Sequence, residues 1–243
     1  MSGAFYLARE ELRSARRSFL AGLAASLALG AVAAALAASS LRTSGAPGLA
    51  AGFALDFVLM LAVGFSHSPR VWAISMRPVY EKRLSRRISF LRTLPVKESV
   101  ISAALALSKA LAVAGFAVVF FAPLSVAGMG SLGVLEYLSF VALWAGCALA
   151  LAGLSLYLEL RFGDRVSFTL FCAIFAALGA GLGTTYGAAL GEGQRTGVAL
   201  RVSEFVAGGG AYAGPLALLA GASVLAAGTA LAARVLRERE MPQ

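Results

Sequence analysis

Long apolar blocks separated by short polar segments run through most of this chain. Most of them reach or exceed the roughly 20 residues that an α-helix needs to cross a bilayer core of about 30 Å. We expect six membrane-spanning helices, at residues 18–38, 47–66, 100–128, 132–158, 166–190 and 206–236. The last three ranges are longer than one crossing, which leaves tilt, an interfacial helix and a re-entrant segment as alternatives for the surplus.

The composition of these blocks favours helices over membrane β-strands. They consist mainly of Ala, Leu, Val, Gly and Phe, without the alternation of polar and apolar residues that a barrel strand requires. Of the 243 residues, 59% are hydrophobic and 14% are charged, against about 45–50% and about 25% in soluble domains. The chain is therefore predicted to be an all-α integral membrane protein whose residues 1–243 form a single transmembrane domain.

The net charge of +9 comes from basic residues that lie mostly on one side of the predicted membrane, so we do not expect nucleic acid as a partner. Basic residues cluster before span one, between spans two and three, between spans four and five, and after span six. The connecting segments of the other side carry only Arg42, Arg195 and Arg201. The positive-inside rule then predicts a multi-pass protein of the cell membrane with both termini in the cytoplasm. The first block exceeds the roughly 7–15 apolar residues of a signal peptide, so we interpret it as a span.

The N-terminal segment, residues 1–17, combines apolar residues at helical spacing with charged ones. Phe5 and Leu12 are seven residues apart, as are Leu12 and Phe19. The charged residues elsewhere around the helix are Glu10, Glu11, Arg13, Arg16 and Arg17. This pattern predicts an amphipathic helix at the membrane interface. A frayed, charged terminus is the alternative.

Residues 67–99 form the longest polar segment and contain a second amphipathic pattern. Its apolar positions share one helical face and are Tyr80, Leu84, Ile88 and Leu91. Its basic positions lie on the other faces and are Lys82, Arg83, Arg86 and Arg87. We expect a cytoplasmic helix that ends before Pro95, because proline disfavours helical geometry in the preceding residue. A topology signal that contacts anionic lipid is the alternative interpretation.

The motifs Tyr80-Glu81-Lys82-Arg83 and Ser89-Phe90-Leu91-Arg92-Thr93-Leu94-Pro95-Val96-Lys97-Glu98 resemble the loop after span two in permeases of type-2 ABC exporters. The resemblance implies that 67–99 is a coupling loop held by a cytoplasmic ATP-hydrolysing subunit. The residues expected at that contact are Glu81, Arg83, Arg86, Arg87, Pro95, Lys97 and Glu98. It further implies a second permease copy or a paralogue as partner, membrane lipids around the spans, and ATP and Mg bound by the partner ATPase. One departure is that many members carry Lys about ten residues after that proline, where this chain has Leu105 and places Lys109 one turn later.

Catalytic motifs are missing from the sequence. Lys82, Lys97 and Lys109 are the only lysines, and none follows the glycine loop of a Walker A motif. The single histidine, His67, and two cysteines within apolar blocks do not make a metal site. We therefore expect a transport subunit that is not an enzyme and that binds no cofactor itself.

Two ionisable residues, Asp56 and Lys109, lie inside apolar blocks, where a charge is costly enough to suggest function. We regard both as candidates for the translocation path, and an ion pair between them is one possibility. An ion-coupled secondary transporter that uses Asp56 is an alternative function. A structural or assembly protein without a nucleotide partner is another.

Glycines recur every four residues along the fifth block, at Gly179, Gly183, Gly187 and Gly191. Small residues at this spacing let two helices approach closely. The pattern predicts a packing face, either within the chain or in a dimer of permeases. The following segment, 191–210, is expected to be an external loop or a re-entrant helix.

Overall fold

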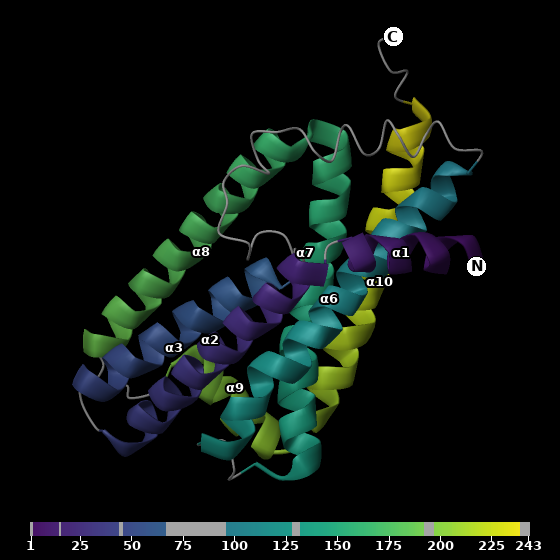
Figure 1. The fold of residues 1–243 in the computed structure, drawn as a ribbon. Helices are drawn as coiled ribbons and strands as arrows, with labels where there is room; N and C mark the ends of the chain where they lie inside the picture. Colours follow the sequence, from purple (N-terminus) through teal and green to yellow (C-terminus); the bar gives the residue numbers. More distant parts are fainter. Residues whose placement is uncertain are drawn as a thin grey trace.

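A computed structural model of the chain describes residues 2–14, 16–43, 46–66, 96–127, 132–191 and 197–238, and over these residues the chain is helical without strands (Figure 1). The helices are α1 (Ser2–Ser14), α2 (Arg16–Arg42), α3 (Ala46–Phe65), α6 (Glu98–Ala127), α7 (Val134–Phe162), α8 (Asp164–Gly191), α9 (Val198–Ala207), the short 3₁₀ turn η1 (Gly210–Tyr212) and α10 (Ala213–Glu238). The all-α prediction is confirmed for this part of the chain.

Within the described residues, five helical stretches are long and apolar enough to cross a membrane. They are Phe19–Arg42, Pro47–Gly64, Glu98–Val126, Val134–Phe162 and Gly210–Glu238. Together they identify a multi-pass membrane protein. The sixth expected span falls on α8, whose apolar part, Thr169–Thr184, is shorter. The number of six spans therefore stays a prediction.

Helices α7 and α10 pack side by side along a seam of small residues. Gly214, Gly221 and Gly228 of α10 face Ser139, Gly146 and Gly153 of α7 in that order. Because the residue numbers rise together along both helices, the two helices are parallel. A Cβ added at Gly221 would lie 2.1 Å from the carbonyl oxygen of Gly146, so the backbones themselves are in contact. Such approach is possible only where side chains are absent or very small.

Helix α8 runs back along α3 in the opposite direction. Phe175 of α8 lies against Gly64, and farther along α8 the hydroxyl of Tyr186 reaches Asp56. Residue numbers therefore rise along α8 in the direction in which they fall along α3. This antiparallel course carries the chain from the end of α7 to the opposite end of the bundle, where α10 begins. It explains how α7 and α10, separated by α8 and α9, come to be parallel.

Near one end of the bundle, α1 lies across the other helices (Figure 1). Leu7 of α1 packs on a core cluster that includes Ile101 at the start of α6, Leu160 at the end of α7 and Leu236 at the end of α10. We call this the α1 end, and the opposite one the far end. Phe5, which the sequence placed on the apolar face of α1, is 62% exposed, and Ala8 is buried instead. The interfacial position of α1 stays a prediction.

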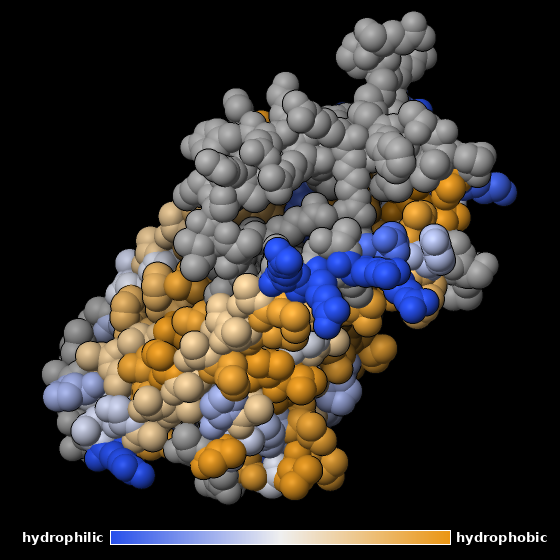
Figure 2. Space-filling model, in the orientation of Figure 1, coloured by the Kyte–Doolittle hydropathy of each residue, from blue (hydrophilic) through white to orange (hydrophobic). Residues whose placement is uncertain are grey.

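The surface has the character expected around a membrane-embedded bundle. Large apolar side chains such as Val118, Val126 and Leu135 are exposed on α6 and α7. Figure 2 shows hydrophilic residues gathered over α1, beside the broad apolar surface of the neighbouring helices. An apolar surface of this extent is unusual for a protein in water and ordinary for one in lipid.

The predicted boundaries differ most at the sixth block. The range 206–236 is predicted as one span with a surplus, but α10 begins only at Ala213. Residues 198–207, within the segment 191–210 expected as an external loop or a re-entrant helix, form the separate helix α9. Gly209 has φ +105°, a backbone conformation that favours glycine and that a continuous helix does not contain. The three consecutive glycines from Gly208 to Gly210 therefore end α9 and redirect the chain.

Candidate functional site

Asp56 lies in the middle of α3, and its carboxylate receives hydrogen bonds at both oxygens. The backbone N–H of Val198 donates to Oδ2 at 2.7 Å, and the N–H of Ala199 donates to Oδ1 at 2.7 Å. The hydroxyl of Tyr186 donates to Oδ2 at 2.5 Å. The side chain is buried, so these three donors take the place of water around the charge.

The two backbone donors belong to the first turn of α9. The first four N–H groups of a helix have no partner within it, and the aligned peptide dipoles make that end positive. A carboxylate at this position accepts hydrogen bonds from the unpaired N–H groups and places a negative charge at the positive end of the helix. An acidic N-cap residue does the same within one helix. Here the acid comes from a different helix, α3, so the interaction fixes α9 against the bundle.

Tyr186 brings α8 into the same cluster. Its ring packs edge-on against Phe53 of α3, with ring centroids 5.1 Å apart, while its hydroxyl reaches the carboxylate. Gly197, immediately before α9, makes room for this arrangement. A Cβ there would lie 2.1 Å from the Tyr186 oxygen and 3.1 Å from Oδ2 of Asp56. Side chains of α3 and α8 and the start of α9 thus meet at one carboxylate.

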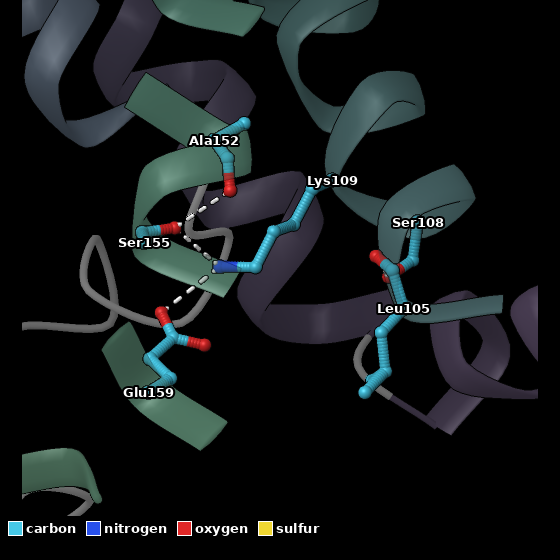
Figure 3. Close-up of polar contacts among 6 residues, drawn as sticks. All are labelled: Leu105, Ser108, Lys109, Ala152, Ser155 and Glu159. Atoms are coloured by element: carbon cyan, nitrogen blue, oxygen red, sulfur yellow. Dashed lines mark hydrogen bonds and ion pairs between the residues drawn. The ribbon is translucent and has the colours of Figure 1, made fainter. Parts of the chain in front are cut away.

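Lys109 forms a second polar cluster, between α6 and α7 (Figure 3). Its Nζ lies 2.9 Å from Oε1 of Glu159 and donates to Oγ of Ser155, also at 2.9 Å. Ser155 in turn donates to the carbonyl of Ala152 at 3.0 Å. The lysine is buried, and the Glu159 side chain is 25% exposed. Because every contact is internal, this cluster joins α6 to α7 in the half of the bundle nearer the α1 end.

The two predicted path candidates are therefore not paired with each other. Each has protein partners that the sequence analysis did not name, Tyr186 and the α9 backbone for Asp56, and Glu159 for Lys109. Glu159 follows directly after the predicted fourth span, 132–158. The only indication of this ion pair in the sequence is that a long lysine side chain can reach a carboxylate near the end of a neighbouring span. That either residue faces a translocation path stays a prediction.

Of the residues predicted to contact the ATPase, the structure describes only Lys97 and Glu98. Lys97 is exposed and Glu98 is half-buried where α6 begins, at the α1 end. The backbone N–H groups of Val100 and Ile101 donate to the carbonyl of Lys97, which fixes this first turn. The other predicted contact residues lie outside the described part of the chain: Glu81, Arg83, Arg86, Arg87 and Pro95.

At two glycines of the predicted face on α8, Gly179 and Gly183, the described part of the chain packs little against the helix. A Cβ at Gly179 would lie 3.9 Å from Cε of Met60, and one at Gly183 would meet nothing within 4 Å. Gly187 and Gly191 lie in the last turns of the same helix. A dimer contact through this face stays a prediction.

Among the described residues, no group of three His, Cys, Asp or Glu side chains could hold a metal ion. Cys147 and Cys172 are free and exposed on α7 and α8. The chemistry of the described part of the bundle is thus that of two internal polar clusters, at Asp56 and at Lys109. Comparison with protein-family models, with curated proteins and with solved structures gave no match.

Proposed function

We propose that this protein is the membrane-spanning subunit of an ABC exporter and that it couples ATP hydrolysis by a separate cytoplasmic ATPase to substrate export. In this proposal the chain is itself not an enzyme. ATP and Mg are bound by the ATPase, and a second permease copy or a paralogue completes the membrane part.

The observation that carries the proposal is that the two helices on either side of residues 67–99, α3 and α6, have their adjoining ends at the α1 end of the bundle. Helix α3 runs towards the α1 end, since Leu55 packs in the core cluster of the far half and Val63 in a cluster nearer the α1 end. Helix α6 begins at the α1 end, where Val96 packs against the cluster around Leu7. The segment with the exporter-like motif therefore connects two helices at the end that α1 covers.

The charges at this end agree with a cytoplasmic position. Exposed basic residues of α1, of the start of α2 and of the ends of α7 and α10 gather there: Arg9, Arg13, Arg16, Arg17, Arg161, Arg234 and Arg237. The far end has Arg42 and Arg201 among its described residues. By the positive-inside rule, the α1 end and both termini face the cytoplasm.

The course of α8 supports a sixth span. Between Gly64 and Asp56, α8 runs alongside α3, which itself has an apolar stretch long enough to cross a membrane. Six crossings are then required for the start of α2 and the end of α10 to lie at one end.

The ion-coupled alternative receives less support from the geometry. A carboxylate that takes up ions or protons during transport needs access to water, whereas Asp56 is buried and both of its oxygens accept hydrogen bonds from the protein. The exporter proposal does not require Asp56 to titrate.

A first experiment tests the ATPase partner. The tagged protein is purified from its native membranes after crosslinking, and the co-purified material is assayed for ATP hydrolysis before and after reconstitution in lipid. We expect a co-purified chain with a Walker A motif whose ATPase activity changes when the permease is present. Repeated purification of the permease without any nucleotide-hydrolysing partner would refute the proposal.

A second experiment tests the coupling segment with charge reversals. In the reconstituted complex, the double substitution of Arg86 and Arg87 to Glu should abolish stimulated ATPase activity, because it reverses the charge of the predicted contact. Reversal of Arg42, an exposed arginine at the far end outside α9, is the control and should leave the stimulation unchanged. An equal effect of this control would argue against a coupling role.

A further inference from the structure

Helix α9 packs on the bundle along one face. Ala199 is fully buried and Leu200 is 3% exposed, and both belong to the core cluster that contains Leu55 and Leu59 of α3 and Phe120 of α6. Towards its other end Val206 is also fully buried, whereas Glu204 and Phe205 are exposed. We call the N-terminal end of α9, which lies in the far half of the core, the seated end.

The seated end is held by a small number of polar contacts. Its environment is otherwise apolar, and its first two N–H groups end on the Asp56 carboxylate. Tyr186 adds the third hydrogen bond and connects α8 to the same group. We refer to these contacts of Asp56 with Tyr186, Val198 and Ala199 as the Asp56 latch. Without the carboxylate, the buried N–H of Ala199 and the partly buried N–H of Val198 would lose their partner, which is unfavourable away from water.

The other end of α9 has the features of a hinge. The chain leaves α9 through three consecutive glycines, and Gly209 at φ +105° is in a conformation that a glycine adopts without strain. Between this hinge and α7, Ser139 supports the adjoining segment, since its hydroxyl donates to the carbonyl of Ala211 at 2.5 Å and accepts from the N–H of Gly214 at 3.1 Å. The segment beyond the hinge is thus fixed to α7, while the seated end of α9 is held by the latch and by the packing of Ala199 and Leu200.

We propose that α9 is a hinged gate at the far end of the bundle and that Asp56 is the positioning residue that latches it closed. Breaking the three hydrogen bonds lets α9 turn about Gly208–Gly210 and opens the core around Leu59 to water from the far side. The latch does not depend on an ATPase partner. That its opening serves an exported substrate rests on the proposed function.

The test measures water access at single cysteines in a chain whose Cys147 and Cys172 are replaced by Ala, reconstituted in lipid nanodiscs. Ala199→Cys reports on the seated end of α9, and Leu59→Cys reports on the core beneath it. Ala152→Cys is the control, because Ala152 is fully buried in a separate cluster with Val63 and Val113. Each is combined with native Asp56, Asp56→Asn or Tyr186→Phe and treated with a membrane-impermeant maleimide.

Asn at position 56 keeps the size of Asp but replaces one acceptor oxygen with a donor NH₂ group and removes the charge. We expect the cysteines at 199 and 59 to react about ten- to a hundredfold faster in Asp56→Asn than with native Asp56, from the cost of losing hydrogen bonds to a charged group. Tyr186→Phe leaves both backbone contacts and should accelerate labelling only a few-fold, by about the effect of one hydrogen bond. The cysteine at 152 should stay unreactive in all three backgrounds.

Unchanged labelling at 199 in Asp56→Asn would overturn the proposal, because α9 would then not depend on the latch. Faster labelling at 199 but not at 59 would also overturn it, because it shows local fraying and no gate. Faster labelling at 199, 59 and 152 together would show loss of the fold in Asp56→Asn; the milder Tyr186→Phe then decides, and unchanged labelling at 199 and 59 in that variant would overturn the proposal. Leu200→Cys, a smaller side chain at a buried position, repeats the measurement if Ala199→Cys itself disturbs α9. None of these readouts uses ATP, so failure of the exporter proposal leaves them valid.

Discussion

Lys109 and Glu159 illustrate how single residues can carry charge inside an apolar bundle. Each charge alone would be costly at this depth, and together they form an ion pair at 2.9 Å with Ser155 as a further acceptor. An internal ion pair of this kind adds little net stability, but removing one member leaves the other without a partner. The pair therefore constrains which faces of α6 and α7 meet.

A double-mutant cycle tests this constraint. Lys109→Met should lower the free energy of unfolding by about 2 kcal/mol, because Glu159 remains without its cation. This loss is smaller than that for a fully buried pair, since Glu159 is partly exposed. Adding Glu159→Gln to that variant should recover most of the loss. The measurement is unfolding in mixed detergent micelles for the native chain, both single variants and the double variant.

Ser155→Ala provides the control for this cycle, since it removes one acceptor and keeps the ion pair. Its effect should be smaller than that of Lys109→Met. If the losses of the two charged residues simply add in the double variant, the pair does not act as a unit.

At the level of elements, the closest helix contact is made by a seven-residue glycine repeat. Gly214, Gly221 and Gly228 meet α7 at equal spacing, and a repeat of seven keeps the same face of a helix turned to its partner along a left-handed crossing. The four-residue repeat on α8 is the more conspicuous pattern in the sequence, yet Gly183 has no neighbour there within 4 Å.

Two glycine-to-alanine substitutions separate these roles. Gly221→Ala places a methyl group 2.1 Å from the carbonyl oxygen of Gly146 and should lower the free energy of unfolding by about 1–3 kcal/mol, as overpacking does. Gly181→Ala meets nothing within 4 Å and should be neutral, or stabilising by up to about 1 kcal/mol through helix propensity. Thermal unfolding of both purified variants measures the difference, and a larger loss for Gly181→Ala would contradict the assignment.

At the scale of the whole molecule, charge and topology distinguish the two ends. The chain starts at the α1 end, and α10 returns to it beside α7. The exposed arginines of α1, α7 and α10 lie at that end. Both features agree with the proposed even number of crossings and with one preferred side for basic residues.

Cysteine labelling in intact cells tests this topology. In a chain without Cys147 and Cys172, single cysteines replace Glu10 and Arg237 at the α1 end, or Arg42 and Arg201 at the far end, all of them exposed positions. An impermeant maleimide should label only 42 and 201 in intact cells and all four positions after permeabilisation. Labelling of 237 together with 201 in intact cells would exclude a crossing by α10 in the proposed direction.

The sequence by itself determined the all-α membrane class, the position of five apolar helices and the segregation of basic residues. These properties are local, because the hydropathy of a segment and the charge of a connecting loop depend only on nearby residues. The three consecutive glycines, Gly208 to Gly210, also indicate a break in the helix. Hydropathy alone did not locate this break, because the predicted range 206–236 runs across it.

Only the tertiary structure decided which residues pair with Asp56 and Lys109. Asp56 reaches a backbone N–H 142 residues away, and Lys109 reaches a carboxylate 50 residues away. Such contacts depend on the rotation and tilt of whole helices, which a count of apolar residues does not fix. The choice of α7 and α10 as the glycine seam has the same cause, since a glycine repeat states that a close approach is possible but not which helix will make it.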